Sequence, residues 1–211
     1  MTQEQVAEQL AQAWAALSGW EVAAVVLGVA YLLLAVKESL WCWYAAFFGT
    51  AISLYVFWQV GLLMESALQI YYLVMAVYGW WQWQQNSHSA SQENSASDTL
   101  PISRWGWQQH CYALAVVLTL SAISGTLLAE HSQAAMPYLD SFTTWGAIVT
   151  TWMVARKVLE NWLYWLVIDG ASIYLYMDRE LYLFALLFAV YLVIVVAGFL
   201  QWLQSYRSSL A

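Results

Sequence analysis

One carboxylic acid stands in the middle of an apolar segment of this chain, and aromatic residues precede it at helical spacing. Asp169 follows Trp162 by seven residues and Trp165 by four, so a helix places all three side chains on one face. Ser172 extends this stripe by one turn. Indole faces hold flat rings and attract cations, while a carboxylate accepts hydrogen bonds or balances a positive charge. The stripe predicts a binding site for an aromatic, hydroxylated or cationic molecule.

A second polar stripe lies earlier in the chain, again at helical spacing. Its members are Glu65, Gln69, Tyr72, Ala76 and Gly79. The amide of Gln69 offers two donors and an acceptor, which suits a ligand amide or hydroxyl. Either Gln69 or Asp169 can instead brace neighbouring helices without touching a ligand, and the pattern leaves that alternative open. We expect Glu65 to lie at the outer rim.

Both stripes belong to a segment that is written twice. Residues 38–83 recur as residues 157–202 after a shift of 119 positions. Matching pairs are Trp43 with Trp162, Tyr72 with Tyr191, Gly79 with Gly198, and Trp83 with Trp202. Duplicated apolar halves are typical of transporters, which place the substrate at the interface between the repeats near the bilayer midplane. The repeat therefore predicts a transport site between the two halves.

The polar residues break this symmetry. Thr50 is the repeat mate of Asp169, and Phe188 is the repeat mate of Gln69. This difference favours a specific role for the two polar side chains. The matched aromatic pairs can line a shared path or pack the halves together, and Asn161 can cap a helix or face the pore. The candidate substrate-binding residues are Gln69, Tyr72, Asn161, Trp162, Trp165, Asp169, Tyr191 and Trp43.

Composition restricts the class of protein. Of the 211 residues, 63% are hydrophobic and only 9% are charged, and the chain holds 15 Trp and 14 Tyr. One soluble core of this size cannot hide so much apolar surface, so we expect an integral membrane protein. The six basic residues are scattered and form no patch for nucleic acid. No phosphate-binding loop, HExxH sequence or intramembrane histidine is found, so we expect neither an enzyme nor a metal or other cofactor.

Seven apolar segments approach the roughly 17–25 residues that a membrane-spanning helix needs. They cover residues 21–36, 41–58, 62–83, 110–129, 141–156, 161–177 and 181–203. The repeat groups them as three, one and three, so the predicted fold is all-α with seven transmembrane helices. Because the single linking span restores the chain direction, both triplets enter the membrane with the same polarity. They are predicted to be parallel repeats related by a pseudo-two-fold axis along the membrane normal.

The same pattern divides the chain into regions. They are an N-terminal segment at 1–20, the first triplet at 21–83, a Ser-rich linker at 84–109, the linking helix at 110–129, the second triplet at 140–203 and a tail at 204–211. The N-terminal segment is expected to form either a short helix at the membrane interface or a frayed tail.

Basic residues predict the orientation. Five of the six lie on one side of the predicted membrane, namely Lys37, Arg104, Arg156, Lys157 and Arg207. Since basic loops stay in the cytoplasm, the N-terminus is expected outside, and the linker and C-terminus inside. Tryptophans at the span ends are expected to form an interfacial aromatic belt. These are Trp80, Trp81, Trp83 and Trp202.

Three runs of sequence resemble those of a known protein family. They are Lys37-Glu38-Ser39-Leu40-Trp41-Cys42-Trp43, Glu160-Asn161-Trp162-Leu163-Tyr164-Trp165 leading to Asp169, and Tyr71-Tyr72-Leu73-Val74-Met75 followed by Tyr78-Gly79-Trp80. In these runs the chain resembles the PnuC family of bacterial nicotinamide riboside (vitamin B3) transporters, over nearly all of residues 21–203. The resemblance implies a location in the bacterial inner membrane and a fold akin to that of SWEET sugar transporters. It also implies a site for nicotinamide riboside between the triplets.

The resemblance implies facilitated diffusion, with a cytoplasmic riboside kinase trapping the substrate, and it is compatible with a homo-oligomer. The cationic ring of the riboside suits Trp162 and Trp165, and its carboxamide and hydroxyls suit Gln69 and Asp169. Two other classes stay open. One is an ion-coupled symporter of a related nucleoside or vitamin, with Asp169 as the relay. The other is a membrane scaffold that carries no cargo.

Overall fold

The computed structural model describes residues 18–59, 63–90, 100–131, 136–178 and 182–210. Within these ranges the chain forms seven helices. They are α2 (Gly19–Val36), α3 (Trp41–Gln59), α4 (Leu63–Ala90), α5 (Trp107–His131), α6 (Pro137–Ala155), α7 (Asn161–Asp178) and α8 (Tyr182–Ser208). Most of the N-terminal segment, for which we expected an interfacial helix or a tail, lies outside the described residues.

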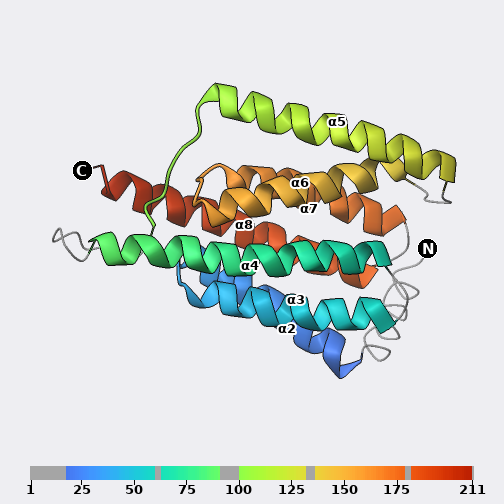
Figure 1. Cartoon of the computed structure of the whole chain (residues 1–211), viewed down its shortest axis with the longest axis horizontal. Helices are drawn as coiled ribbons and strands as arrows, with labels where there is room; N and C mark the ends of the chain where they lie inside the picture. The colour runs from blue at the N-terminus through green and yellow to red at the C-terminus, as the bar shows by residue number, and fades with distance from the viewer. Residues whose placement is uncertain (1–17, 60–62, 91–99, 132–135, 179–181, 211) are drawn as a thin grey trace.

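The helices form two bundles of three joined by a single helix, which confirms the predicted order of three, one and three (Figure 1). The first bundle contains α2, α3 and α4, and the second contains α6, α7 and α8, while α5 packs along α6. Between the bundles, α2 packs on α8 and α4 packs on α6. These two contacts are equivalent under the repeat. Corresponding helices run in the same direction, so the repeat is parallel.

Four of the helices, α2, α3, α5 and α8, are long and apolar enough to cross a membrane by length and composition alone. The other three carry more polar residues, several of which turn inward. In α6, for example, buried Thr150 and Thr151 each donate a 2.7 Å hydrogen bond to a carbonyl of their own helix. Polar groups satisfied in this way need no water, so such helices are tolerated inside a membrane bundle. The molecule is an all-α integral membrane protein.

Several helices extend beyond the predicted spans. Helix α4 continues to Ala90 rather than ending at 83, and α8 continues to Ser208 rather than 203. Helix α6 begins at Pro137, whose fixed φ suits the first turn of a helix. The predicted ends followed the apolar runs. A helix satisfies its own backbone hydrogen bonds, so it can continue in polar sequence beyond the bilayer.

The two bundles have matching turns at one end of the molecule, hereafter the basic end. The described basic residues Lys37, Arg104, Arg156, Lys157 and Arg207 all lie at helix ends or in loops there. The turns after α2 and α6 place the repeat mates Glu38 and Lys157 in the left-handed region, with φ of 55° and 49°. Non-glycine residues rarely adopt this region. The repeat therefore extends to an uncommon backbone conformation.

Two tryptophans contradict the expected interfacial belt. Trp83 and Trp202 are fully buried, at 0% exposure, in the main hydrophobic core, where their ring centroids lie 6.2 Å apart. Trp81, by contrast, is 46% exposed. A position near a helix end does not reveal which face of the helix a side chain occupies. Trp83 and Trp202 lie on the faces that meet the opposite bundle.

Candidate functional site

Three of the predicted site residues lie at one depth in the molecule. Tyr72 and Tyr191 follow the starts of α4 and α8 by nine residues, and Asp169 precedes the end of α7 by nine. At a rise of 1.5 Å per residue, each lies about 14 Å from the end opposite the basic end. Tyr191 is within electrostatic range of the Asp169 carboxyl. Its hydroxyl also reaches α2, 3.1 Å from where a Cβ on Gly28 would lie.

Two further tyrosines, which the sequence analysis missed, join these residues. Tyr176 on α7 lies within electrostatic range of Tyr72 and Tyr191. Tyr31 on α2 lies within the same range of Tyr72. Tyr176 follows Asp169 by seven residues, so the helical spacing of the stripe contained its signal. We call the five residues Tyr31, Tyr72, Tyr176, Tyr191 and Asp169 the tyrosine–aspartate group; it draws side chains from both bundles.

Several polar atoms at this depth lack a protein partner. Asp169 is only 3% exposed, yet its carboxyl has no hydrogen bond or ion pair with any described residue. Within the same ranges, the polar side-chain atoms of half-buried Gln69, Tyr72 and Tyr191 also have no hydrogen-bond partner. None of these atoms is among the fully enclosed side-chain atoms without a partner, so they border space that water or a polar ligand can reach. Polar atoms that face such a space are typical of the interior of a binding site.

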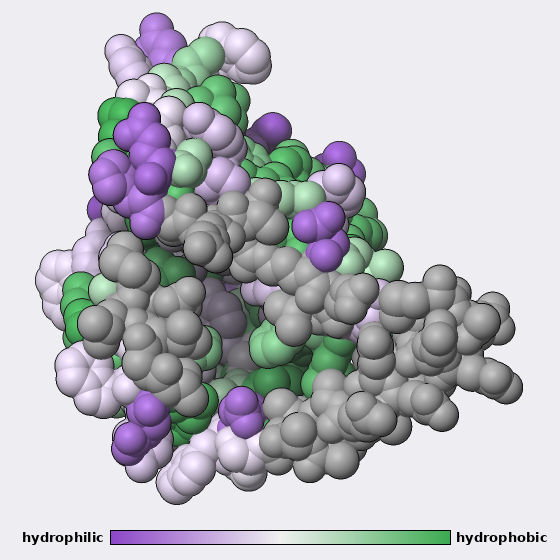
Figure 2. Space-filling model, turned by 90° about the vertical axis from the view of Figure 1, so that its right-hand side faces the viewer, coloured by the Kyte–Doolittle hydropathy of each residue, from purple (hydrophilic) through white to green (hydrophobic). Residues whose placement is uncertain are grey.

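The molecule is hollowed at the end where α4 and α8 begin. Figure 2 looks at this end and shows a recess at the centre of the face. Measured along their helices, Tyr72, Tyr191 and Asp169 lie between this end of the molecule and the tryptophans buried near the basic end. The candidate site is therefore positioned at the interface between the bundles, at intermediate depth.

The rest of the predicted α7 stripe makes other contacts. The Ser172 hydroxyl donates to the Ile168 carbonyl at 2.9 Å, so its proton is already used. The Asn161 amide nitrogen donates to the Val158 carbonyl at 2.7 Å, while its buried oxygen has no partner among the described residues. Trp165 is half buried and packs against the hydrophobic core. Helix α7 therefore uses Ser172 and Asn161 to brace backbone and leaves Trp165 partly accessible.

The other predicted site residues, Trp43 and Trp162, lie closer to the basic end. With Trp83 and Trp202 they form what we call the tryptophan cluster, in which every ring is at most 2% exposed. The repeats have the same geometry here. Trp43 meets Trp83 edge to face at a centroid distance of 5.4 Å, and Trp162 meets Trp202 in the same way at 5.3 Å. The cluster fills the space between the bundles on the basic side of Asp169.

An ion pair between buried Lys157 and half-buried Glu38 joins the bundles beside the tryptophan cluster. Lys157 Nζ lies 2.6 Å from Glu38 Oε2 and 4.6 Å from the centroid of the Trp83 ring. Burial lowers the pKa of the Lys157 ammonium, and the Glu38 carboxylate opposes that shift. Trp202 adds a hydrogen bond of 3.0 Å from its Nε1 to the Ala35 carbonyl. These contacts hold the basic ends of the two bundles together.

Residues 100–106, hereafter the connector, precede α5 and bind to the turn after α6. Ser103 forms an isolated parallel β-bridge with Val158, built from two hydrogen bonds of 2.9 Å. Arg104 pairs with Glu160 at 2.8 Å. Together these contacts hold the connector against the turn that carries Lys157. The linker was expected only to join the halves, and its fastening role was not predicted.

Comparison with known proteins places this geometry in context. A family model described as nicotinamide mononucleotide transporter matches residues 18–204. The riboflavin/roseoflavin transporter RibM of Streptomyces davaonensis is 27% identical over 186 residues, which cover 87% of this chain and 84% of the relative. The nicotinamide riboside transporter PnuC of Escherichia coli is 23% identical over 210 residues, which cover 90% of this chain and 87% of the relative.

The fold also matches a solved structure. The crystal structure of the vitamin B3 transporter PnuC aligns with a TM-score of 0.66 at 17% identity, covering 88% of this chain and 81% of that one. At this identity the match shows a common fold, and it agrees with the two parallel bundles and the single linking helix.

Proposed function

Because the chain belongs to the nicotinamide mononucleotide transporter family, we propose that this membrane transporter carries nicotinamide riboside across the bacterial inner membrane by facilitated diffusion. The family and the relatives are transporters and not enzymes. Two of those relatives are named for different cargoes, nicotinamide riboside and riboflavin. The choice between these cargoes must therefore come from the chemistry of the site.

The buried carboxyl of Asp169 is the observation that carries the proposal. It has no partner among the described residues, and burying an unpaired carboxylate is unfavourable. The pyridinium ring of nicotinamide riboside supplies a positive charge that would balance it. The phenol rings of Tyr72 and Tyr191 add favourable surroundings for a cation. Riboflavin, whose ring is uncharged, would leave the carboxylate unbalanced, so the site favours the riboside.

The distribution of charge also favours the riboside over its phosphorylated form. All described basic residues lie at the basic end, and the tryptophan cluster separates them from the depth of Asp169. A phosphate bound at that depth would meet a carboxylate and no described cation, which is electrostatically unfavourable. We therefore propose an unphosphorylated substrate, which a cytoplasmic riboside kinase would trap after entry.

Each predicted site residue has a role in this proposal. Asp169 faces the charged ring and Trp165 stacks on it, while Gln69, Tyr72 and Tyr191 bind the carboxamide and ribose hydroxyls. Trp43, Trp162 and Asn161 lie deeper and form the barrier beneath the bound substrate. The indole N–H groups of Trp43 and Trp162 have no hydrogen-bond partner among the described residues. They can therefore donate hydrogen bonds to the substrate as it passes the barrier.

Alternating access suits this arrangement. The recess at one end and the closed contacts at the other support a carrier whose basic end is shut. By the positive-inside rule the basic end faces the cytoplasm, with the N-terminus outside and the C-terminus inside. Because the positive charge of the substrate itself balances Asp169, no co-transported cation is needed. This favours uniport over ion-coupled symport.

Calorimetric titration of the detergent-purified protein tests the proposed substrate. We expect saturable binding of nicotinamide riboside and at least tenfold weaker binding of nicotinamide mononucleotide and of riboflavin. Tight binding of riboflavin without binding of the riboside would replace the proposal with the RibM-like alternative. No saturable heat with any of the three would contradict a carrier of this class and favour a scaffold.

A further inference from the structure

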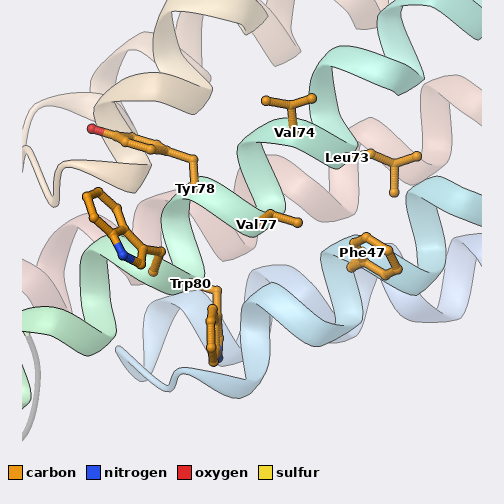
Figure 3. Close-up of a pocket in the computed structure, with 7 residues that line it drawn as sticks. Phe47, Leu73, Val74, Val77, Tyr78 and Trp80 are labelled. Atoms are coloured by element: carbon orange, nitrogen blue, oxygen red, sulfur yellow. The ribbon is translucent and has the colours of Figure 1, made fainter.

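An apolar groove runs along α3 and α4 on the outside of the first bundle, separate from the tyrosine–aspartate group (Figure 3). Its volume is about 610 Å³, and its wall includes Phe47, Leu73, Val74, Val77, Tyr78 and Trp80. Val74 and Val77 are 61% and 54% exposed. In a membrane protein such an open apolar surface faces lipid acyl chains. This open, wholly apolar surface can accommodate a hydrocarbon chain.

A cation stands beside the groove at the basic end. The Arg156 guanidinium donates a hydrogen bond of 3.2 Å to the hydroxyl of Tyr78, and it lies 5.5 Å from the centroid of the Trp152 ring. Arg156 is exposed and has no acidic partner within the described ranges, whereas Arg104 and Lys157 are each paired with a glutamate. A guanidinium has five N–H donors in a planar fork that matches phosphate geometry. Most of those donors remain available here.

We propose that this groove is a binding site for one anionic phospholipid, with an acyl chain along α4 and the phosphate held by Arg156. Tyr78, Trp80 and Trp81 follow the other α4 lining residues toward the basic end. In the proposed pose they therefore lie between the acyl chain and the headgroup, where tryptophan and tyrosine are favoured in membranes. An unneutralised cation at the membrane surface selects an anionic headgroup over a zwitterionic one. Because Arg156 belongs to the second bundle and the groove to the first, the lipid bridges the two.

The repeat supplies an internal comparison. The mates of Tyr78, Trp80, Trp81 and Arg156 are Ala197, Phe199, Leu200 and Lys37. The equivalent surface of α8 therefore lacks the hydroxyl that orients the cation and both indoles. Lysine presents a point charge instead of a bidentate fork. The proposal thus predicts one preferred lipid site per chain instead of two.

Native mass spectrometry of the purified protein tests the site directly. The probes are phosphatidylglycerol and phosphatidylcholine with identical acyl chains, titrated against the unmodified chain and the variants Arg156→Gln, Lys37→Gln and Val77→Trp. Phosphatidylglycerol should form the dominant adduct, with one tight site per chain. Arg156→Gln should weaken that adduct on the order of tenfold, since it removes a charge-assisted contact. Lys37→Gln should leave it unchanged, and Val77→Trp should block the groove for both lipids.

The same spectra contain the outcomes that would overturn the proposal. Equal adducts with the two lipids would mean that the groove does not select charge. An equal loss of the phosphatidylglycerol adduct in Arg156→Gln and Lys37→Gln would mean that the basic residues attract the lipid only by their overall positive charge, without a specific site. If Val77→Trp changes the number of chains in the assembly and leaves the lipid adduct intact, the groove is a contact between copies of this chain and the lipid assignment is wrong. Because Arg156→Gln leaves the core untouched, a folding failure of Val77→Trp does not remove the test.

Discussion

Lys157 and Glu38 occupy equivalent positions in the two repeats, 119 residues apart, and their side chains bond to each other at 2.6 Å. Residues at equivalent positions meet in this way only where they lie close to the pseudo-two-fold axis. The bond joins the bundles beside the tryptophan cluster, and the two backbones share the same left-handed turn. We propose that this pair and the tryptophan cluster separate when the basic end opens.

Removing the carboxylate should loosen the basic end. Glu38→Gln removes the carboxylate charge that pairs with the buried Lys157 ammonium. Because Glu38 is only half-buried, the expected cost lies below the roughly 3–5 kcal/mol of a fully buried pair. Cys42 is buried nearby at 0% exposure and reports opening, whereas Cys111 is exposed and is first replaced by serine. We expect Cys42 to react with a water-soluble maleimide on the order of tenfold faster in Glu38→Gln.

The matched control exchanges the two charges. Glu38→Lys combined with Lys157→Glu keeps the pair across the axis and should restore slow labelling of Cys42. Equal labelling of Cys42 in Glu38→Gln and the parent would show that the ion pair does not hold the basic end closed.

The glycine beneath Trp162 should be sensitive to a single methyl group. A Cβ on Gly198 would lie 2.6 Å from the Trp162 ring, which is too close for the packed cluster to accept without a shift. Gly198→Ala should lower the stability by about 1–3 kcal/mol, as overpacking does. The thermal unfolding midpoint in detergent measures this change. Gly170→Ala is the control, because nothing lies within 4 Å of its Cβ position, and it should be neutral or stabilising.

Asp169 should control the preference for a cationic ligand. Asp169→Asn keeps the shape of the side chain and removes the charge, so we expect affinity for nicotinamide riboside to fall by about one to two orders of magnitude. Binding of an uncharged analogue, the reduced riboside, should change little. Ser172→Ala lies one turn away and removes a hydroxyl already bonded to Ile168, so it should bind normally. Titration calorimetry of both variants checks this, and equal losses would point to a general disturbance of α7.

The fastened connector should detach when its ion pair is removed. Glu160 accepts from Arg104 at 2.8 Å and from the backbone N–H of Trp105 at 3.2 Å. Glu160→Gln should weaken both contacts and speed hydrogen exchange of the Ser103 and Leu159 amides several-fold, since these amides form the bridge beside it. Exchange in the last turns of α3 (Trp41–Gln59), at the end of the molecule opposite the connector, should stay constant. Unchanged protection of the bridge would mean that the backbone bonds alone hold the connector.

The repeat allowed the fold to be predicted from sequence. A shift of 119 positions implied two triplets, and the single span between them implied that the triplets are parallel. Apolar runs set the helix count correctly but not the helix ends, because α4 and α8 continue in polar sequence. The stripe around Asp169 indicated which face of α7 turns inward, and the burial of Trp162, Asp169 and Ser172 agrees with it.

The contacts across the axis could not be predicted in the same way. Helix periodicity shows which residues share a face but not which two faces meet, so Trp83 and Trp202 were assigned to the membrane interface instead of the core. The opposite charges of Glu38 and Lys157 did contain a signal. Repeat mates that carry opposite charges in the same turn can form an ion pair across a two-fold axis. A comparison of the charges of the repeat mates would therefore have identified this pair.

Uptake of labelled nicotinamide riboside into liposomes that contain only the purified protein tests the proposed uniport. We expect saturable uptake that stops when the internal and external concentrations are equal, with or without an imposed proton or sodium gradient. In Asp169→Asn, uptake at low riboside concentration should fall in line with the weaker binding. Accumulation above the external concentration under a gradient would contradict uniport. Absence of saturable riboside uptake by the folded protein would contradict the proposed transport itself.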